Sequence, residues 1–190
     1  MAMFEGVSGR IAASVMARMN AEAEAEAVAR LDPAAGSAVL VIGFGPGVGI
    51  ERLLGRPVGR VVGVDPSLVM YEIAADRNRD AIDAGRLELV PTVVADLPLE
   101  YGPFDGAIAV HTLQICRPFG PTAARLAALL KPGGRLIAIT HAWAARKDYG
   151  DEDAFIGEVS GGLQAAGFER VHCALADAEK RTALLIEAVR

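Results

Sequence analysis

Short runs of apolar, largely β-branched residues alternate with helix-forming segments along most of this chain. Strands are expected in seven such runs, over residues 37–43, 59–65, 86–94, 104–111, 135–141, 168–176 and 181–190. Helical patterns lie between them, near residues 48–55, 67–84, 122–131 and 154–166. Strands buried on both faces lose the alternation of polar and apolar residues. This order therefore predicts an α/β fold with a parallel sheet covered by helices on both faces.

The N-terminal segment has a different composition. Residues 21–27 read "AEAEAEA", which alternates at period two, yet alanine and glutamate are strong helix formers. Apolar residues at helical spacing on either side of it extend the predicted helix to a stop near Asp32 and Pro33. A chain of 190 residues is long enough for one domain with a full core. We expect a single domain over residues 1–190, with a helical lead-in over 1–34 and the α/β core over 35–190.

Composition and charge exclude several classes of protein. No run approaches the roughly 18 to 20 apolar residues that a membrane helix needs, and the N-terminus lacks the pattern of a signal peptide. Cys116 and Cys173 have no metal-binding spacing, which favours a reducing, cytoplasmic location. The net charge of −5 argues against a general nucleic-acid binder. The expected partner is therefore a small molecule, with neither nucleic acid nor a membrane.

The stretch "VIGFGPGVGI" at residues 41–50 places four glycines directly after the first strand. In such sheets a ligand lies beyond the carboxyl ends of the strands, and a bare turn lets the backbone approach it closely. A phosphate-binding P-loop is excluded because no lysine follows the glycines. The dinucleotide pattern Gly-x-Gly-x-x-Gly fits poorly, since its third glycine would fall on Val48 or Ile50. The pattern that remains is Gly43-x-Gly45-x-Gly47.

With this alternation the sequence resembles the class I S-adenosylmethionine-dependent methyltransferases, of the small bacterial type. "VLVIGFGPGVGI" (39–50) resembles their first motif, and "VVGVDPSLVM" (61–70) resembles their second. "FDGAIAVHTLQ" (104–114) and "ALLKPGGRLIAIT" (128–140) are similar to their fourth strand and to their following helix, turn and fifth strand. The resemblance implies a Rossmann-like, doubly wound, mostly parallel seven-stranded sheet with an antiparallel last strand.

The resemblance also implies a set of cofactor-binding residues. It assigns the S-adenosylmethionine site to Gly43, Phe44, Gly45, Gly47, Asp65, Pro66, Val93, Val94 and Asp96. Asp65 lies where the family places an acid on the ribose hydroxyls, although an N-cap of the next helix is an alternative role for it. Two positions depart from the family pattern. Val41 stands where an acid usually helps to hold the methionine end, and Val93 stands where the adenine amino group is usually bound. A shift of three residues would let Asp96 replace the second acid.

Two histidines are candidates for the chemistry. His111 ends the fourth predicted strand and His141 ends the fifth, both at the edge where ligands lie. Either could act as a general base toward an alcohol, phenol or thiol, or could simply bond to the backbone of a loop. His172 lies within the sixth predicted strand and is interpreted as structural. The segment after His141 is short, so a lid would have to come from the N-terminal helix or from a second subunit in a homodimer.

The leading hypothesis is therefore S-adenosylmethionine-dependent methyl transfer to a small-molecule acceptor. A methyltransferase-like binding or regulatory protein without catalysis is one alternative, and Val41 and Val93 favour it. An NAD(P)-dependent oxidoreductase is a second alternative, weakened by the misplaced third glycine. The sequence leaves open the identity of the acceptor and whether O, N, S or C is methylated.

Overall fold

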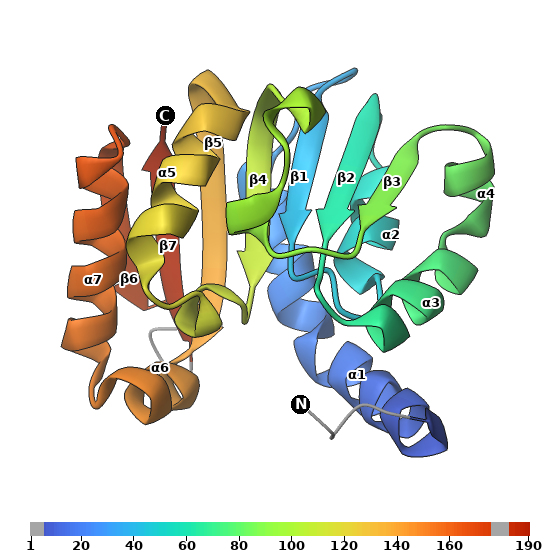
Figure 1. Cartoon of the computed structure of the whole chain (residues 1–190), viewed down its shortest axis with the longest axis horizontal. Helices are drawn as coiled ribbons and strands as arrows, with labels where there is room; N and C mark the ends of the chain where they lie inside the picture. The colour runs from blue at the N-terminus through green and yellow to red at the C-terminus, as the bar shows by residue number, and fades with distance from the viewer. Residues whose placement is uncertain (1–5, 176–182) are drawn as a thin grey trace.

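The computed structural model describes residues 6–175 and 183–190, with side chains from residue 18 onward. One seven-stranded sheet runs through it in the order β3-β2-β1-β4-β5-β7-β6 (Figure 1). Strands β1 to β5 pair in parallel, and β7 pairs antiparallel with both β5 and β6. The predicted mostly parallel sheet with an antiparallel last strand is confirmed. The strands are β1 (Ala38–Ile42), β2 (Arg60–Val64), β3 (Leu87–Val90), β4 (Phe104–Val110), β5 (Leu130–His141), β6 (Glu169–Leu175) and β7 (Ala183–Val189).

Helices cover both faces of the sheet, as the continuous apolar strands require. Figure 1 shows α5 and α7 in front of the sheet and α1 and α2 behind it. Within β1, Leu40 and Ile42 pack on the side of α5 and α7, whereas Val39 and Val41 pack on the side of α1 to α3. The helices are α1 (Gly6–Leu31), α2 (Val48–Leu54), α3 (Leu68–Arg77), α4 (Arg79–Asp83), α5 (Phe119–Leu129), α6 (Ala142–Tyr149) and α7 (Glu152–Ala165), with short 3-10 turns η2 (Val94–Asp96), η3 (Leu99–Tyr101) and η4 (Leu113–Ile115).

The structure differs from the sequence-based expectation in four elements. The helix expected over 67–84 is divided at Asn78, whose buried side chain donates a hydrogen bond to the Ala74 carbonyl oxygen (2.9 Å). Strand β3 ends at Val90 because proline follows it. Strand β5 starts at Leu130 and so includes the Lys-Pro-Gly-Gly segment, which was expected to be a turn. Helix α6 was not predicted. Residues 176, 181 and 182 of the last two predicted strands lie outside the described residues.

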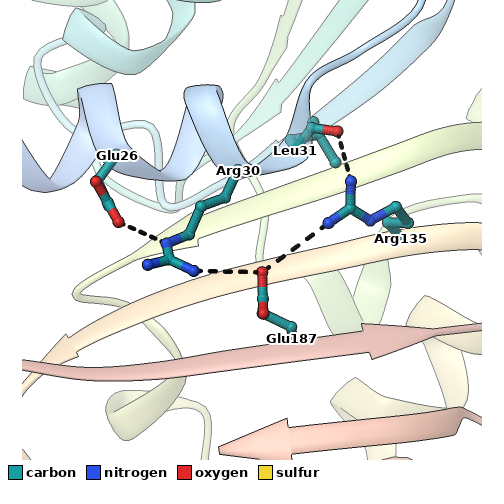
Figure 2. A network of polar contacts seen from close by, with 5 residues as sticks. All are labelled: Glu26, Arg30, Leu31, Arg135 and Glu187. Carbon is teal, nitrogen blue, oxygen red and sulfur yellow. Dashed lines mark hydrogen bonds and ion pairs between the residues drawn. The ribbon is translucent and has the colours of Figure 1, made fainter. Parts of the chain in front are cut away.

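A polar network connects the C-terminal end of helix α1 to strands β5 and β7 (Figure 2). Arg30 bonds to Glu26 at 2.5 Å and lies 3.8 Å from the Glu187 carboxylate on β7. Arg135 on β5 lies 3.9 Å from the same carboxylate and donates to the Leu31 carbonyl oxygen at 3.0 Å. The network therefore positions the C-terminal end of α1 against the sheet. From there α1 extends past the carboxyl ends of the strands (Figure 1).

Within residues 6–175 and 183–190, no helix is both long and apolar enough to cross a bilayer.

Candidate functional site

The order of the strands changes direction between β1 and β4, where open α/β sheets bind ligands. Two adjoining cavities lie at the carboxyl ends of the strands there. The first, which we call the loop cavity, measures about 310 Å³ and is lined by the glycine loop, Asp65, His111 and two residues of α1. The second, the adjoining cavity, measures about 410 Å³ and shares Gly43 and Thr112 with the first. Together they form a continuous candidate site around the end of β1.

A third cavity, of about 380 Å³, lies at the opposite edge of the sheet, among Asp105, Lys131 and Arg135. Its charged groups already have partners. Lys131 Nζ lies 2.5 Å from Asp105 Oδ1, and Asp105 Oδ2 accepts a hydrogen bond from the Ala38 amide at 2.8 Å. We therefore assign this edge a structural role and place the candidate site at the carboxyl ends.

The glycine loop takes a backbone path that side chains would block. Gly43, Gly45 and Gly47 all have positive φ angles, of 68°, 49° and 83°. A Cβ atom at Gly43 would lie 2.2 Å from the Thr112 Oγ1 atom, whereas one at Gly45 would meet nothing within 4 Å. Arg77 Nε donates to the Pro46 carbonyl oxygen at 2.8 Å and holds the loop from α3. The bare backbone at Gly45 is thus the part of the loop that faces open space.

Asp65 directly follows β2 and lines the loop cavity. Its Oδ2 atom accepts from the Gly45 amide at 3.0 Å, and its Oδ1 atom accepts from the Ser67 amide at 2.9 Å. Burial raises the pKa of this carboxyl, and the two backbone hydrogen bonds oppose that shift. The N-cap of α3 is Ser67, which accepts from the Met70 amide, so Asp65 is not the cap. Each carboxylate oxygen keeps a lone pair that a ligand hydroxyl could use.

The other cofactor residues predicted from the resemblance divide into two groups. Phe44 is buried in the wall of the loop cavity, and Pro66 lines both cavities. Val93 and Val94 line the adjoining cavity, where Val93 is half exposed. Asp96 is exposed at the end of η2 and belongs to the lining of neither cavity. The structure therefore does not bring Asp96 together with the rest of the predicted site.

His111 and His141 do lie together. Their rings stack with centroids 3.6 Å apart, and the His111 Nδ1 atom accepts a hydrogen bond from the His141 backbone amide at 3.1 Å. Burial, followed by the charge of His141, lowers the pKa of His111 to about 4. Because Nδ1 is an acceptor, the neutral ring carries its proton on Nε2. That Nε2 atom is buried without a partner among the described residues, and His111 is one of the residues that line the loop cavity.

Two large apolar side chains near this site are exposed. Ile115, which lines both cavities, is 69% exposed, and Trp143 is 57% exposed. Trp143 continues the histidine stack, since its ring lies 5.8 Å from that of His141. Helix α6, which holds Trp143, contacts the segment after the η4 turn through Arg117, whose guanidinium lies 4.3 Å from the Tyr149 ring centroid. Large exposed apolar side chains beside a cavity are typical of a surface that binds an apolar ligand.

Sequence reasoning missed one group of site residues. Asn20 and Glu24 of α1 also line the loop cavity. Glu24 lies four residues after Asn20, and the buried Ala27, Val28 and Leu31 lie seven, eight and eleven residues after it. At these spacings all five residues share one face of the helix. A charged residue at helical spacing from a buried apolar stripe is the signal that could have identified Glu24.

No metal centre accompanies these residues. In the part of the chain that the structure describes, no group of three or more His, Cys, Asp or Glu residues could hold a metal ion.

Comparison with known proteins agrees with this site. Residues 39–134, just over half of the chain, match the family described as "Methyltransferase domain". The matched segment contains the glycine loop, Asp65 and His111. The chain therefore belongs to the family of methyltransferase domains, as the resemblance predicted.

Individual relatives span different shares of the chain. It is 32% identical over 108 residues to the O-methyltransferase cnsE of Penicillium expansum, across 57% of this chain and 39% of cnsE. It is 25% identical over 162 residues to the uncharacterized methyltransferase YdaC of Bacillus subtilis, across 85% of this chain and 87% of YdaC. The chain thus spans well under half the length of cnsE.

Among solved structures, a geranyl diphosphate methyltransferase in complex with SAM superposes with a TM-score of 0.72 at 16% identity. The superposition covers 91% of this chain and 86% of that one. At this level of identity the likeness shows a shared fold.

Proposed function

We propose that this protein transfers a methyl group from S-adenosylmethionine to a small-molecule acceptor. The observation that carries the proposal is Asp65, whose carboxylate is fixed by the Gly45 and Ser67 amides at the wall of the loop cavity. Such a carboxylate can accept hydrogen bonds from the two hydroxyls of a ribose. Membership of the methyltransferase-domain family supports the same cofactor. Bound there, the cofactor would supply a methyl group on a positively charged sulfur, ready for displacement by a nucleophile.

Separate parts of the site would bind the ribose and the adenine base of a nucleoside. Asp65 would bind the ribose and the bare backbone at Gly45 would approach the sugar. The adjoining cavity, with Val93 and Val94 in its wall, would take the adenine base through apolar contact. Thr92 and Thr122 also line that cavity, and their hydroxyls could bond to the base in place of the acid missing at Val93.

His111 is suited to orienting the acceptor. Its ring stays neutral above about pH 5. Its Nε2–H group has no partner among the described residues, and in this proposal it would donate a hydrogen bond to the oxygen of an acceptor bound beside His111. A donor in this place would hold the oxygen in line with the methyl group, and positioning of this kind contributes much of the rate in a displacement reaction. If the acceptor must lose a proton, His141 remains the candidate general base.

The acceptor is proposed to be a small molecule with an apolar or aromatic body and an oxygen nucleophile. The exposed Ile115, which lines both cavities, and the exposed Trp143, whose ring stacks on His141, support the apolar body. The name of cnsE, an O-methyltransferase, supports the oxygen. Three further expectations remain predictions, namely a single domain over residues 1–190, a homodimer and a cytoplasmic location.

Calorimetry with S-adenosylmethionine, S-adenosylhomocysteine and NAD tests the proposal directly. We expect the two sulfur nucleosides to bind and NAD not to bind. Turnover is then measured as release of S-adenosylhomocysteine with a panel of phenols and alcohols. Binding without turnover on any acceptor would instead favour a methyltransferase-like binding module, which the apolar Val41 and Val93 suggest as the second candidate. Failure of both nucleosides to bind would reject the proposal.

A further inference from the structure

Glu24 on α1 is a buried carboxylate inside the proposed cofactor site. Only 8% of the residue is exposed, yet it lines the loop cavity. No hydrogen bond reaches its carboxylate from the described residues, and the one neighbouring charge that acts on it is Arg52, an exposed residue of α2. Burying an ionised carboxylate without hydrogen bonds is costly. A group in this position is expected to bind a donor that the protein itself does not provide.

The fourth glycine of the loop sequence makes room for this carboxylate. Gly49 lies in the first turn of α2, and its φ angle is not in the left-handed region. A Cβ atom at Gly49 would lie only 2.1 Å from the Glu24 Oε2 atom. The glycine at position 49 is therefore required by close packing against Glu24 rather than by backbone conformation.

The residue at position 41 does not supply a carboxylate to the loop cavity. Val41 is 3% exposed and belongs to the apolar cluster that β1 forms with α1, α2 and α3. The acid that the sequence lacks at the end of β1 is thus supplied to the loop cavity from α1. The polar network of Arg30, Arg135 and Glu187 holds the following turn of α1 against the sheet and so fixes where Glu24 lies (Figure 2).

The acidic side chains around the loop cavity favour a cationic ligand, whose binding stabilises their ionised form. Two acids, Glu24 and Asp65, line it, whereas His111 is neutral and Arg52 is exposed to solvent. Such a cavity attracts a positive group and disfavours phosphates. Asp65 offers acceptors for hydroxyl groups, and Glu24 offers acceptors for a cationic donor elsewhere in the same cavity.

We propose that Glu24 binds the ammonium group at the amino-acid end of the cofactor and that Gly49 provides the space for this contact. The proposal rests on the proposed function, because it assumes that a sulfur nucleoside occupies the loop cavity. It assigns to α1 a binding role beyond covering the sheet.

Two ligands that differ only at the amino-acid end test the proposal. S-adenosylhomocysteine carries the ammonium group, whereas 5′-methylthioadenosine keeps the adenosine and the sulfur but lacks the amino acid. We expect Glu24→Gln to raise the Kd of S-adenosylhomocysteine by about 10-fold to 100-fold, as for loss of a charged hydrogen bond. The Kd of 5′-methylthioadenosine should stay within about twofold. Glu22→Gln, at an exposed position of the same helix, is the matched control and should change neither Kd.

A second variant tests the role of Gly49. Gly49→Ala should displace the Glu24 carboxylate and weaken S-adenosylhomocysteine in the wild-type background, but should add little in the Glu24→Gln background. Circular dichroism confirms that each variant is folded. Equal weakening of both ligands by Glu24→Gln, or no weakening of either, would overturn the proposal. If the wild type binds neither ligand, the nucleoside cofactor itself is rejected, and the role of Glu24 falls with it.

Discussion

At the scale of single residues, two buried groups in the loop cavity have pKa values displaced in opposite directions. Burial raises the pKa of Glu24 to about 7 and lowers that of His111 to about 4. Both shifts keep the groups uncharged, as burial favours the neutral form of an acid and of a base alike. Near Glu24 and His111 the apo site therefore carries little charge at pH 6. A bound cation would favour the ionised form of Glu24 and so make this part of the protein more negative.

The stability of the apo protein should report the ionisation of Glu24. Its folded pKa of about 7 lies above the ordinary value of 4.5, so the folded state holds more protons than the unfolded state between these values. Stability from this group is present below pH 4.5 and is lost as the pH rises to 7. We expect Glu24→Gln to be about 2 to 3 kcal/mol more stable than wild type at pH 8 and about equal at pH 4.

Urea unfolding of both proteins across this range measures the difference. Comparing the two proteins is necessary because His111 acts oppositely. Its lowered pKa adds stability above pH 6.5 that is lost as the pH falls toward 4, and the comparison cancels this effect. A difference between wild type and Glu24→Gln that is independent of pH would show that Glu24 ionises normally.

The rate of methyl transfer should not follow the titration of His111 near neutral pH. With a pKa of about 4, His111 is already neutral at pH 6 and donates through Nε2. We expect His111→Ala to lower kcat/KM by about 10-fold, the effect of one lost hydrogen bond, without changing the shape of the pH profile from 6 to 8. A wild-type rate that rises through pH 6.5 and becomes flat in His111→Ala would instead make His111 the general base.

At the scale of elements, the turn from β1 to α2 packs closely against the residues that follow β4. Gly43 has a positive φ angle, and the Thr112 side chain occupies the space where a Cβ atom would lie. Thr112 Oγ1 is itself held by a hydrogen bond to the Val110 carbonyl oxygen at 3.0 Å. The two segments are far apart in the sequence, so neither motif alone reveals this constraint.

A double-mutant cycle measures that constraint. Gly43→Ala should destabilise the protein by about 2 to 4 kcal/mol, because it adds backbone strain to a steric clash. In a Thr112→Ala background the clash with Oγ1 and Cγ2 is gone, so the same substitution should cost at least about 1 kcal/mol less. Gly45→Ala, with a positive φ but open space around it, is the control for strain alone. Additive effects of Gly43→Ala and Thr112→Ala would contradict the packing described here.

At the scale of the whole molecule, α1 is joined to the opposite half of the sheet through Glu187, as Figure 2 shows. Both ion pairs are long, at 3.8 and 3.9 Å, and the side chains are 29% to 43% exposed. Partly exposed pairs of this kind contribute little to stability, since solvent and salt screen them. The network is accordingly expected to position α1 rather than to hold the fold together.

Salt dependence tests this interpretation. Glu187→Gln should lower the free energy of unfolding by less than about 1 kcal/mol at low salt, and the difference should fall toward zero in 1 M NaCl. The affinity for S-adenosylhomocysteine is measured in parallel, because a loosened α1 would carry Glu24 away from the cavity. A loss of stability well above 1 kcal/mol that persists in high salt would mean that the network supports the core.

The sequence by itself determined the features that depend on local patterns. Alternating apolar runs predicted the sheet and its two covered faces. Backbone conformation and burial on both faces leave signals within a few neighbouring residues, which explains why these predictions succeeded. The break at Asn78, by contrast, depends on a side chain that also reaches the Gly47 carbonyl oxygen, 31 residues away.

Only the tertiary structure decided how the site is charged. Glu24 lines the loop cavity because α1 packs against α2 and α3, and Asp96 is excluded because it is exposed to solvent on η2. His111 changes from a candidate base to a buried donor because its ring stacks on His141 and bonds to that residue's backbone amide. Each of these outcomes depends on burial and on contacts between residues distant in the chain, and pKa values respond to that surrounding volume rather than to sequence neighbours.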